Sequence, residues 1–249
     1  MATICITGST DGIGRATAER LLAAGLRVLV HSRSEQRGRP VVDVLTGDVD
    51  LVTGDLASLA EVRSLAEQIA PHGPLDALVH NAGVWVRGNT PRRSADGHET
   101  TFAVNVLAPH VLTALLAEQI TGRVLWLGSG MAGSGRPDPD DPGAATEPRR
   151  AYADSKAADV ALAGAWGRRL PQVGSAALDP GWVKTKLASP GAPGEVTSSA
   201  TSLAHLSTEA DLSRGLYWKG RSPTKVPARV RDEAFQDRLA ATCDRLGRL

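Results

Sequence analysis

The chain has few cysteines, no excess of charge of either sign and no long hydrophobic run. Its two cysteines, Cys5 and Cys243, indicate neither a disulfide framework nor a metal cluster. With 28 basic and 27 acidic side chains, the net charge of +1 gives no sign of a nucleic-acid or anionic-membrane partner. No stretch reaches the ~18 apolar residues of a membrane span, and the first apolar run begins too early to leave room for a signal peptide. We therefore expect a soluble, cytoplasmic protein without a metal site.

What the sequence does have is a regular alternation of short apolar runs with longer segments of helical period. The apolar runs lie at 3–7, 27–30, 49–53, 75–80, 124–127, 174–178 and 215–219. Helical periodicity is found at 59–69, 97–119, 203–214 and 229–246. Connections of this length are too long for hairpins, so the strands are expected to be parallel. The pattern predicts an α/β protein with a single-domain Rossmann fold over residues 1–249, a doubly wound parallel sheet of about seven strands with helices on both faces.

A glycine-rich turn, Gly-Ser-Thr-Asp-Gly-Ile-Gly at 8–14, follows the first expected strand and precedes a helix that Gly25 is placed to end. Glycine lets the backbone turn sharply and lets a pyrophosphate approach the helix N-terminus, where free N–H groups and the helix dipole favour an anion. We interpret this turn as a phosphate-binding site. A purely structural tight turn is the alternative.

Tyr152 and Lys156 lie four residues apart in a segment that favours helix, so both side chains should share one face. An ammonium group near a phenol favours the phenolate and lowers the pKa of the phenol from about 10 toward the range of a working proton donor or acceptor. Taken alone, the pair is also compatible with a helix that carries one aromatic side chain and one solvated lysine.

The spacing Gly-x-x-x-Gly-x-Gly after Thr7 resembles that of the short-chain dehydrogenase/reductase family. Three further motifs occur in the order found in that family: Asn81-Ala82-Gly83, Tyr152-x-x-x-Lys156 and Pro180-Gly181. The long spacing between Ser129 and Tyr152 resembles the retinol-dehydrogenase-like branch and related bacterial ketoreductases. The extra residues, 135–150, are expected to form a loop insertion beside the site, and 186–214 a loop and helix that cover the substrate.

The resemblance implies an NADP(H)-dependent oxidoreductase that transfers a hydride between the nicotinamide and a ketone, aldehyde or secondary alcohol. Tyr152 would donate or accept the proton, and Lys156 would lower the pKa of that tyrosine and hold the nicotinamide ribose. Ser129 would hydrogen-bond the substrate oxygen, with Ser134 as a fallback, and Asn105 would complete a proton relay. A non-catalytic dinucleotide-binding sensor is the alternative function.

The cofactor contacts that the resemblance implies come from the motifs and from the ends of the first three strands. They are Gly8, Ser9, Thr10, Gly12, Ile13, Gly14, Arg33, Asp55, Leu56, Asn81, Ala82, Gly83, Tyr152, Lys156, Pro180, Gly181, Val183 and Thr185. Ser32 stands where NAD-preferring relatives carry aspartate, and Arg33 can grip a 2′-phosphate with its planar fork. We therefore expect NADPH to be preferred over NADH. The alternative is that Arg33 is an ordinary surface charge, and Asp11 is a departure because some NADP-preferring relatives have a basic residue in the turn.

Trp85, Trp182 and the loop from Ser189 are expected to line an apolar pocket for a bulky carbonyl substrate, with a purely structural role as the alternative. The helices around Asn105 and Tyr152 often form subunit interfaces in relatives of this family. A homodimer or homotetramer is therefore expected, and a monomer stays open.

Overall fold

One mixed sheet of eight strands forms the centre of the computed structural model, which describes residues 1–86, 92–145, 147–187 and 191–249. The strands follow the order β3-β2-β1-β4-β5-β6-β7-β8. Their bounds are β1 Thr3–Ile6, β2 Arg27–Ser32, β3 Val49–Thr53, β4 Leu75–His80, β5 Ile120–Leu127, β6 Gly174–Asp179, β7 Tyr217–Lys219 and β8 Ser222–Pro223. The first seven strands are parallel, as predicted, and the two-residue β8 adds an antiparallel edge.

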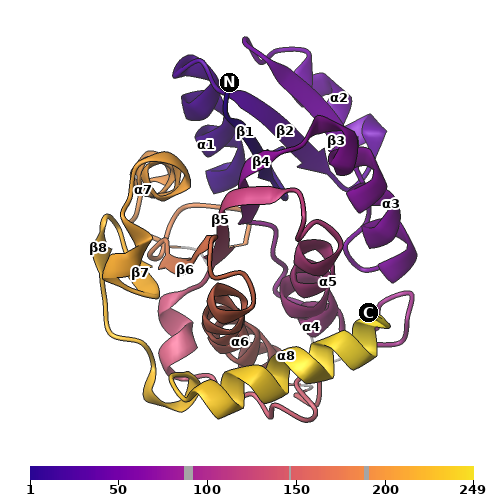
Figure 1. The fold of residues 1–249 in the computed structure, drawn as a ribbon, viewed down its shortest axis with the longest axis vertical. Coiled ribbons are helices and arrows are strands. Elements are labelled where there is room, and N and C mark those ends of the chain that lie inside the picture. The colour runs from indigo at the N-terminus through magenta and orange to yellow at the C-terminus, as the bar shows by residue number, and fades with distance from the viewer. Residues whose placement is uncertain (87–91, 146, 188–190) are drawn as a thin grey trace.

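Helices cover both faces of the sheet (Figure 1). One face carries α1 (Gly12–Ala23), α2 (Glu35–Val42) and α7 (Val196–Thr208), and the other carries α3 (Leu59–Ile69), α5 (Ala108–Leu115), α6 (Pro148–Arg169) and α8 (Glu233–Gly247). Within β1, Cys5 packs into the core on the α3–α6 side, whereas Ile4 and Ile6 pack into the core on the α1–α7 side. A strand buried on both faces needs apolar residues at every position, which accounts for the continuous apolar runs in the sequence.

The long helix predicted for 97–119 is shorter and less regular than expected. It starts at α4 (Thr100–Phe102), passes through a π-helical segment at Ala103–Leu107, and ends with α5 at Leu115. Pro109 has no N–H to donate to the carbonyl of residue 105, so an unbroken α-helical ladder cannot run through this region. The widened turn carries Asn105.

Two loop boundaries also differ from those expected. Helix α6 already begins at Pro148, because the Glu147 carboxylate accepts hydrogen bonds from the N–H groups of Arg149 and Arg150 and so caps the helix. Helix α7 begins at Val196 and ends at Thr208, before a short 3-10 turn, and residues 188–190 lie outside the described residues.

The C-terminal helix α8 crosses the outer side of α5 and α6 (Figure 1). Asp244 on α8 accepts hydrogen bonds from His110 on α5 at 2.7 Å and from Arg169 on α6 at 2.7 Å. The faces of α5 and α6 that meet α8 are therefore covered by this chain itself. Among the described residues, no helix is long and apolar enough to cross a membrane.

Candidate active site

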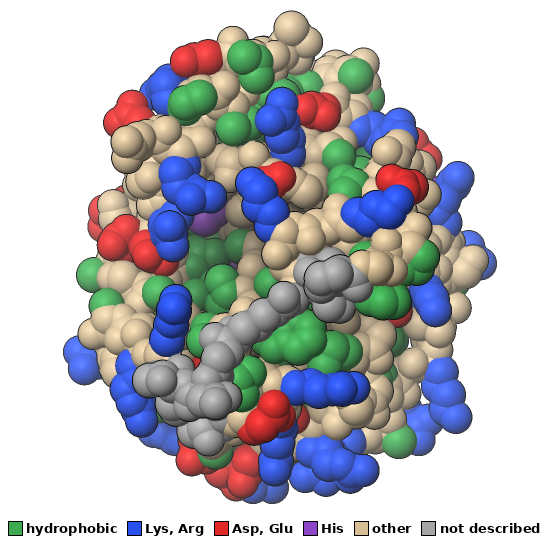
Figure 2. Space-filling model, turned by 180° about the vertical axis from the view of Figure 1, so that it is seen from behind, with side chains coloured by type: hydrophobic (Ala, Val, Ile, Leu, Met, Phe, Trp, Pro, Cys, Tyr) green, Lys and Arg blue, Asp and Glu red, His purple; other side chains and the backbone are tan. Residues whose placement is uncertain are grey.

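A cavity of about 520 Å³ opens at the carboxyl ends of the central strands, between the glycine turn and α6. Figure 2 shows the hollowed face, with apolar side chains inside the hollow and lysine and arginine side chains around it. Ten of the predicted site residues line this cavity: Ile13, Asn81, Gly83, Ser129, Tyr152, Lys156, Pro180, Gly181, Val183 and Thr185. Both predicted tryptophans, Trp85 and Trp182, line it as well. Segments far apart in the sequence thus meet where parallel sheets usually bind ligands.

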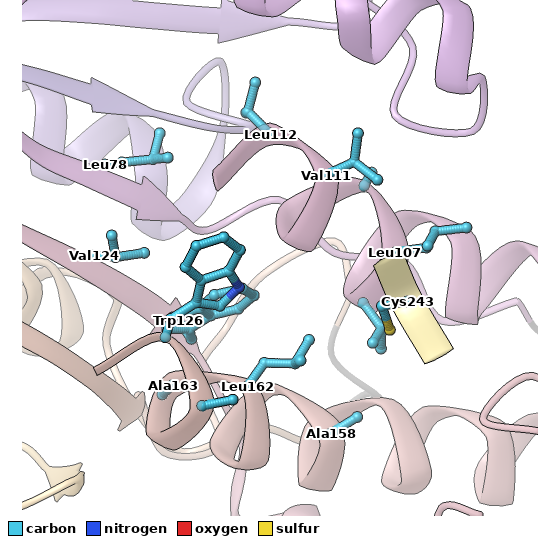
Figure 3. Close-up of a cluster of buried hydrophobic side chains, with 14 of the residues drawn as sticks. Leu78, Leu107, Val111, Leu112, Val124, Trp126, Ala158, Leu162, Ala163 and Cys243 are labelled. Carbon is cyan, nitrogen blue, oxygen red and sulfur yellow. The ribbon is translucent and has the colours of Figure 1, made fainter. Parts of the chain in front are cut away.

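Helix α6 places Tyr152 and Lys156 on one face, as their spacing predicts. The Lys156 ammonium lies 5.8 Å from the centre of the Tyr152 ring, and both residues are buried. Figure 3 shows how the helix is held, with Trp126 of β5 packed beside Leu162 and Ala163 further along α6. The tyrosine and the lysine therefore stand on a rigid, buried helix rather than on a loop.

Lys156 makes two hydrogen bonds that the sequence pattern did not anticipate. Its Nζ donates to the Leu127 carbonyl at 2.8 Å and to Asp159 Oδ2 at 2.9 Å. Burial lowers the pKa of the Lys156 ammonium, but the negative charge of Asp159, together with that of Tyr152 when its phenol is ionised, outweighs this effect and raises the pKa overall. Lys156 is therefore a charged group at neutral pH.

Asn105 is fully hydrogen-bonded to neighbouring residues. Its Oδ1 accepts from Val84 N at 2.7 Å, and its Nδ2 donates to Val84 O and to Ser155 Oγ, each at 3.0 Å. A Cβ at Gly83 would lie 3.5 Å from Asn105 Oδ1 and 3.7 Å from Lys156 Nζ, so glycine keeps the space between these two groups open. The side chain of Asn105 thus ties α6 to the segment that follows β4.

Ser129 follows β5 and lines the cavity, whereas the exposed Ser134 does not. The Ser129 Oγ accepts a hydrogen bond from Met131 N at 3.2 Å, and its carbonyl accepts one from the Tyr217 hydroxyl at 2.8 Å. A Cβ at Gly128 would lie 3.3 Å from the Tyr217 ring and 3.4 Å from the Leu178 carbonyl oxygen. Tyr217 therefore supports Ser129, and its ring leaves little room for a side chain at position 128, where family members usually have a first serine.

The glycine turn is packed tightly against the end of β4. Gly8 has a φ of +64°, and a Cβ there would come within 2.8 Å of the Cα of Ala82. Asn81 Nδ2 donates to the carbonyls of Thr7 at 2.8 Å and Gly8 at 3.0 Å. Asp11 caps the following helix through Gly12 N, and no acidic side chain lies in the first turn of α1. The Asp11 carboxylate therefore satisfies the Gly12 amide at the N-terminus of α1, and no second acidic side chain lies in that turn.

Some predicted contact residues use their side chains internally. Ser9 is completely buried; its Oγ donates to the Ile6 carbonyl and accepts from His31 N. Asp55 Oδ1 accepts from Ala57 N at 2.9 Å, and the neighbouring Leu56 is buried. Like Arg33, Asp55 and Leu56 lie beyond the carboxyl ends of β2 and β3 and outside the 520 Å³ cavity.

His31 is a site residue that sequence reasoning missed. Its Nδ1 accepts a hydrogen bond from Gly8 N, and its Nε2 donates to the Gly54 carbonyl, both at 2.9 Å. Burial lowers the pKa of His31 to about 4, so the ring is neutral at pH 7. A histidine at the end of an otherwise apolar strand was the available signal. It links the glycine turn to the turn after β3.

The segment after β6 reaches over the glycine turn. A Cβ at Gly12 would lie 3.4 Å from Thr185 Cγ2, and Lys186 Nζ lies 2.5 Å from Asp11 Oδ2. The hydrogen bond from Lys186 is the main cause of the lowered pKa of Asp11. Asp11, which departs from the pattern of some NADP-preferring relatives, is therefore already paired with a lysine.

The fold and the cavity define a protein of the Rossmann class, with a glycine turn at the N-terminus of α1 and a Tyr-x-x-x-Lys helix across the cavity from it. The family model described as short chain dehydrogenase matches residues 2–195. The chain therefore belongs to the short-chain dehydrogenase/reductase family, as predicted from its motifs, and is an oxidoreductase of that family.

Two relatives and one solved structure illustrate the similarity. The chain is 32% identical to an uncharacterised oxidoreductase, AN7799, of Emericella nidulans, over 98% of this chain and 96% of the relative. It is 35% identical to a protein named as a candidate daunorubicin C-13 ketoreductase, DnrU, of Streptomyces sp. (strain C5), over 74% of this chain and 67% of the relative. The crystal structure of a blue fluorescent protein from a metagenomic library in complex with NADPH superposes with a TM-score of 0.71, at 26% identity, covering 88% of this chain and 96% of that one.

Proposed function

We propose that this chain is an NADP(H)-dependent carbonyl reductase or alcohol dehydrogenase. The observation that carries the proposal is the convergence of Ser129, Tyr152 and Lys156 on one cavity whose other wall comes from the glycine turn and from Pro180-Gly181. The name of DnrU refers to a ketone as its substrate, and the crystal structure of the blue fluorescent protein holds NADPH. Both similarities favour a carbonyl substrate and a nicotinamide cofactor here.

A dinucleotide fits the residues around the cavity. Gly8 and Ala82 lie in direct contact, which keeps the turn tight, and the first turn of α1 contains no acidic side chain, although the Asp11 carboxylate before it accepts from Gly12 N. When bound, the nicotinamide would supply or accept a hydride. Thr185 and Pro180 would meet it from the other side, and Lys156 would hold its ribose.

Within this site the side chains have separate roles. Tyr152 would give a proton to the developing alkoxide of the substrate, or take one from an alcohol, and the Lys156 ammonium would stabilise the phenolate that results. Ser129 would donate a hydrogen bond to the substrate oxygen. Asn105 would hold α6 in register through Ser155 and would contribute to the proposed proton relay from Lys156.

The proposed preference for NADPH over NADH is based on the environment of Arg33. This residue is exposed, follows the end of β2, and forms no ion pair within the described part of the chain, so its guanidinium is free to meet a 2′-phosphate. Ser32 is buried and carries no negative charge that would repel that phosphate.

The substrate is proposed to be a bulky, apolar carbonyl compound, because Trp85 and Trp182 both line the cavity.

Equilibrium titrations with NADPH and NADH at one salt concentration, followed by a panel of bulky ketones and aldehydes, test this proposal. NADPH is expected to bind at least about tenfold more tightly, a difference of about 1.4 kcal/mol, and to be oxidised in a carbonyl-dependent reaction. Failure to bind either dinucleotide would overturn the proposal. Binding without turnover of any carbonyl would favour the non-catalytic sensor.

A further inference from the structure

A buried carboxylate lies directly behind Lys156. Asp159 is one turn further along α6, and its Oδ2 accepts a hydrogen bond from Lys156 Nζ at 2.9 Å. The side chains of Lys156 and Asp159 are only 5% and 3% exposed, so water does little to screen the pair. The second oxygen, Oδ1, is buried and has no hydrogen-bond partner within the described residues. Among the described residues, Lys156 is therefore the hydrogen-bond partner of this carboxylate.

The two hydrogen bonds of Lys156 limit how many N–H donors it can offer to a ligand. An ammonium group has three N–H donors. One is taken by the Leu127 carbonyl and one by Asp159, so a single donor is left for the cavity that Lys156 lines. Removing one partner of a buried ion pair leaves the other charge uncompensated, which is far more costly than losing an exposed pair. Asp159 therefore fixes both the direction and the charge of Lys156.

We propose that Asp159 is a positioning residue that holds the Lys156 ammonium and offsets its charge, so that the net charge facing Tyr152 depends on whether Asp159 is protonated. The inference rests on the proposed function, because it assigns the roles of Lys156 and Tyr152 as given there. Asp159 would act through Lys156 and would not touch the substrate or the cofactor.

The surroundings of Asp159 bring its pKa into a pH range in which the enzyme can be assayed. Burial raises the pKa of Asp159 to about 6, although the charge of Lys156 lowers it. Within the described residues, the ionisable groups that interact with the pair are Tyr152 on the same helix and Tyr217 on β7, which also feels the charge of Asp179 at the end of β6. His110 on α5 contacts α6 further along, at Trp166. The pair is therefore neutral overall above about pH 6 and positively charged below it.

Replacing Asp159 by asparagine keeps an oxygen for Lys156 but removes the charge at every pH. The wild-type profile of log kcat/KM for carbonyl reduction is expected to change slope near pH 6, and Asp159→Asn is expected to lose this inflection. The basic limb should also move to lower pH, by about one unit or more. Two effects act in that direction: an unpaired Lys156 favours the phenolate, and a buried ammonium without its counter-charge loses its proton more readily.

The matched control is Asp154→Asn, the same change at another buried carboxylate of α6. Asp154 accepts a hydrogen bond from Arg136 N and lies 3.5 Å from Arg150, and it makes no contact with Lys156 within the described residues. This variant is expected to keep both the inflection and the basic limb. Superimposable profiles of the wild type and Asp159→Asn would overturn the inference. If Asp159→Asn fails to fold, the pH profile of the wild type is the test. A wild-type profile without an inflection between pH 5 and 7 overturns the inference.

A binding measurement separates this inference from the proposed function. If no carbonyl compound is turned over, the affinity for NADP⁺, followed by tryptophan fluorescence, can still be measured from pH 5 to 8. The wild type is expected to gain affinity below pH 6, beyond any change in Asp159→Asn, because the protonated carboxyl leaves Lys156 unpaired beside an anionic ligand. The comparison with Asp159→Asn cancels the titration of the 2′-phosphate itself, which also falls near pH 6. Identical pH dependence in both proteins would overturn the inference even where catalysis is absent.

Discussion

Trp85 stacks on Tyr152, with ring centroids 4.8 Å apart and ring planes within 11° of parallel. Stacked aromatic pairs contribute about 0.5–1.5 kcal/mol beyond the area they bury. The contact packs the Tyr152 ring against the segment that follows β4, while helix α6 fixes the backbone of the tyrosine. Because Trp85 also lines the cavity, the same indole restrains the proposed proton donor and shapes the space offered to a substrate.

The phenol of Tyr152 is expected to be required for turnover but not for dinucleotide binding. Tyr152→Phe keeps the ring that Trp85 covers and removes only the proton donor, so kcat should fall by at least about 10²-fold, the lower end of what general acids contribute. The Kd for NADPH should stay within about threefold of the wild-type value, or about 0.65 kcal/mol. Steady-state kinetics and a fluorescence titration measure both quantities. Undiminished activity in this variant would refute the assignment of Tyr152 as the acid.

Tyr217 provides the matched control, since it is the other tyrosine of the chain. Its hydroxyl supports the carbonyl of Ser129 and does not line the cavity. Tyr217→Phe loses one hydrogen bond, of the order of 1 kcal/mol, and is expected to reduce kcat far less than Tyr152→Phe.

Arg33 is expected to determine the choice between NADPH and NADH. Arg33→Ala removes the guanidinium proposed to meet the 2′-phosphate, so the ratio of Kd values for NADH and NADPH should fall at least tenfold, about 1.4 kcal/mol. Arg39→Ala is the control, because Arg39 is an exposed arginine of α2 that pairs with Glu35. An unchanged ratio in Arg33→Ala, measured at the same ionic strength, would mean that Arg33 is an ordinary surface charge.

Much of the fold could be predicted from the sequence because the strands are buried on both sides. In β1, for example, Cys5 packs into the core on one face of the sheet, and Ile4 and Ile6 pack into the core on the other. Because both faces are buried, every position of the strand needs an apolar side chain. The edge strand β8 was not predictable in this way, since Ser222–Pro223 is too short to show a period. The interruption at Asn105 had a visible cause in Pro109, which lies inside the stretch predicted to be helical.

The site was predictable only as far as its motifs extend. The glycine turn, Asn81 and the Tyr152–Lys156 pair follow family spacings. From outside the motifs, His31 contacts the glycine turn, Asp159 contacts Lys156, and Tyr217 contacts Ser129. Asp159 could have been found, because side chains three residues apart meet on a helix. Tyr217 could not, because its contact with Ser129 depends on how β7 pairs with β6.

The network that joins α8 to α5 and α6 is expected to stabilise the fold in a pH-dependent way. Burial would raise the pKa of Asp244, but the hydrogen bonds from His110 and Arg169 outweigh it and hold that pKa well below its usual range. A carboxylate with a lowered folded-state pKa stabilises the protein above its unfolded pKa, about 3.9, and loses this contribution as the pH falls below that value. Asp244→Asn should therefore lower the free energy of unfolding at pH 7 by about 1.5–3 kcal/mol, with the difference from wild type shrinking below pH 4.

The control for that measurement is Asp237→Asn, a change on the same helix. Asp237 pairs with Arg168, but its side chain is 60% exposed. Exposed pairs contribute little, so this variant should stay within about 1 kcal/mol of the wild type at pH 7. Urea unfolding at pH 7 and pH 3.5 measures all three proteins. Equal losses in the two variants would mean that Asp244 has no special role.

Gly14 is expected to be intolerant of any side chain, because the glycine turn and the end of β4 are in direct contact there. A Cβ at Gly14 would overlap Asn81 Nδ2 and lie 2.7 Å from the carbonyl oxygen of Gly8, so Gly14→Ala must push apart the two segments that form the proposed phosphate cradle. Overpacking of this kind costs about 1–3 kcal/mol of stability, and the Kd for NADPH should rise at least tenfold, about 1.4 kcal/mol. Gly133→Ala is the matched control, since a Cβ there meets no atom within 4 Å and the backbone has no positive φ. Thermal unfolding and NADPH titration of both variants provide the measurement, and wild-type affinity in Gly14→Ala would show that the turn does not form the cofactor cradle.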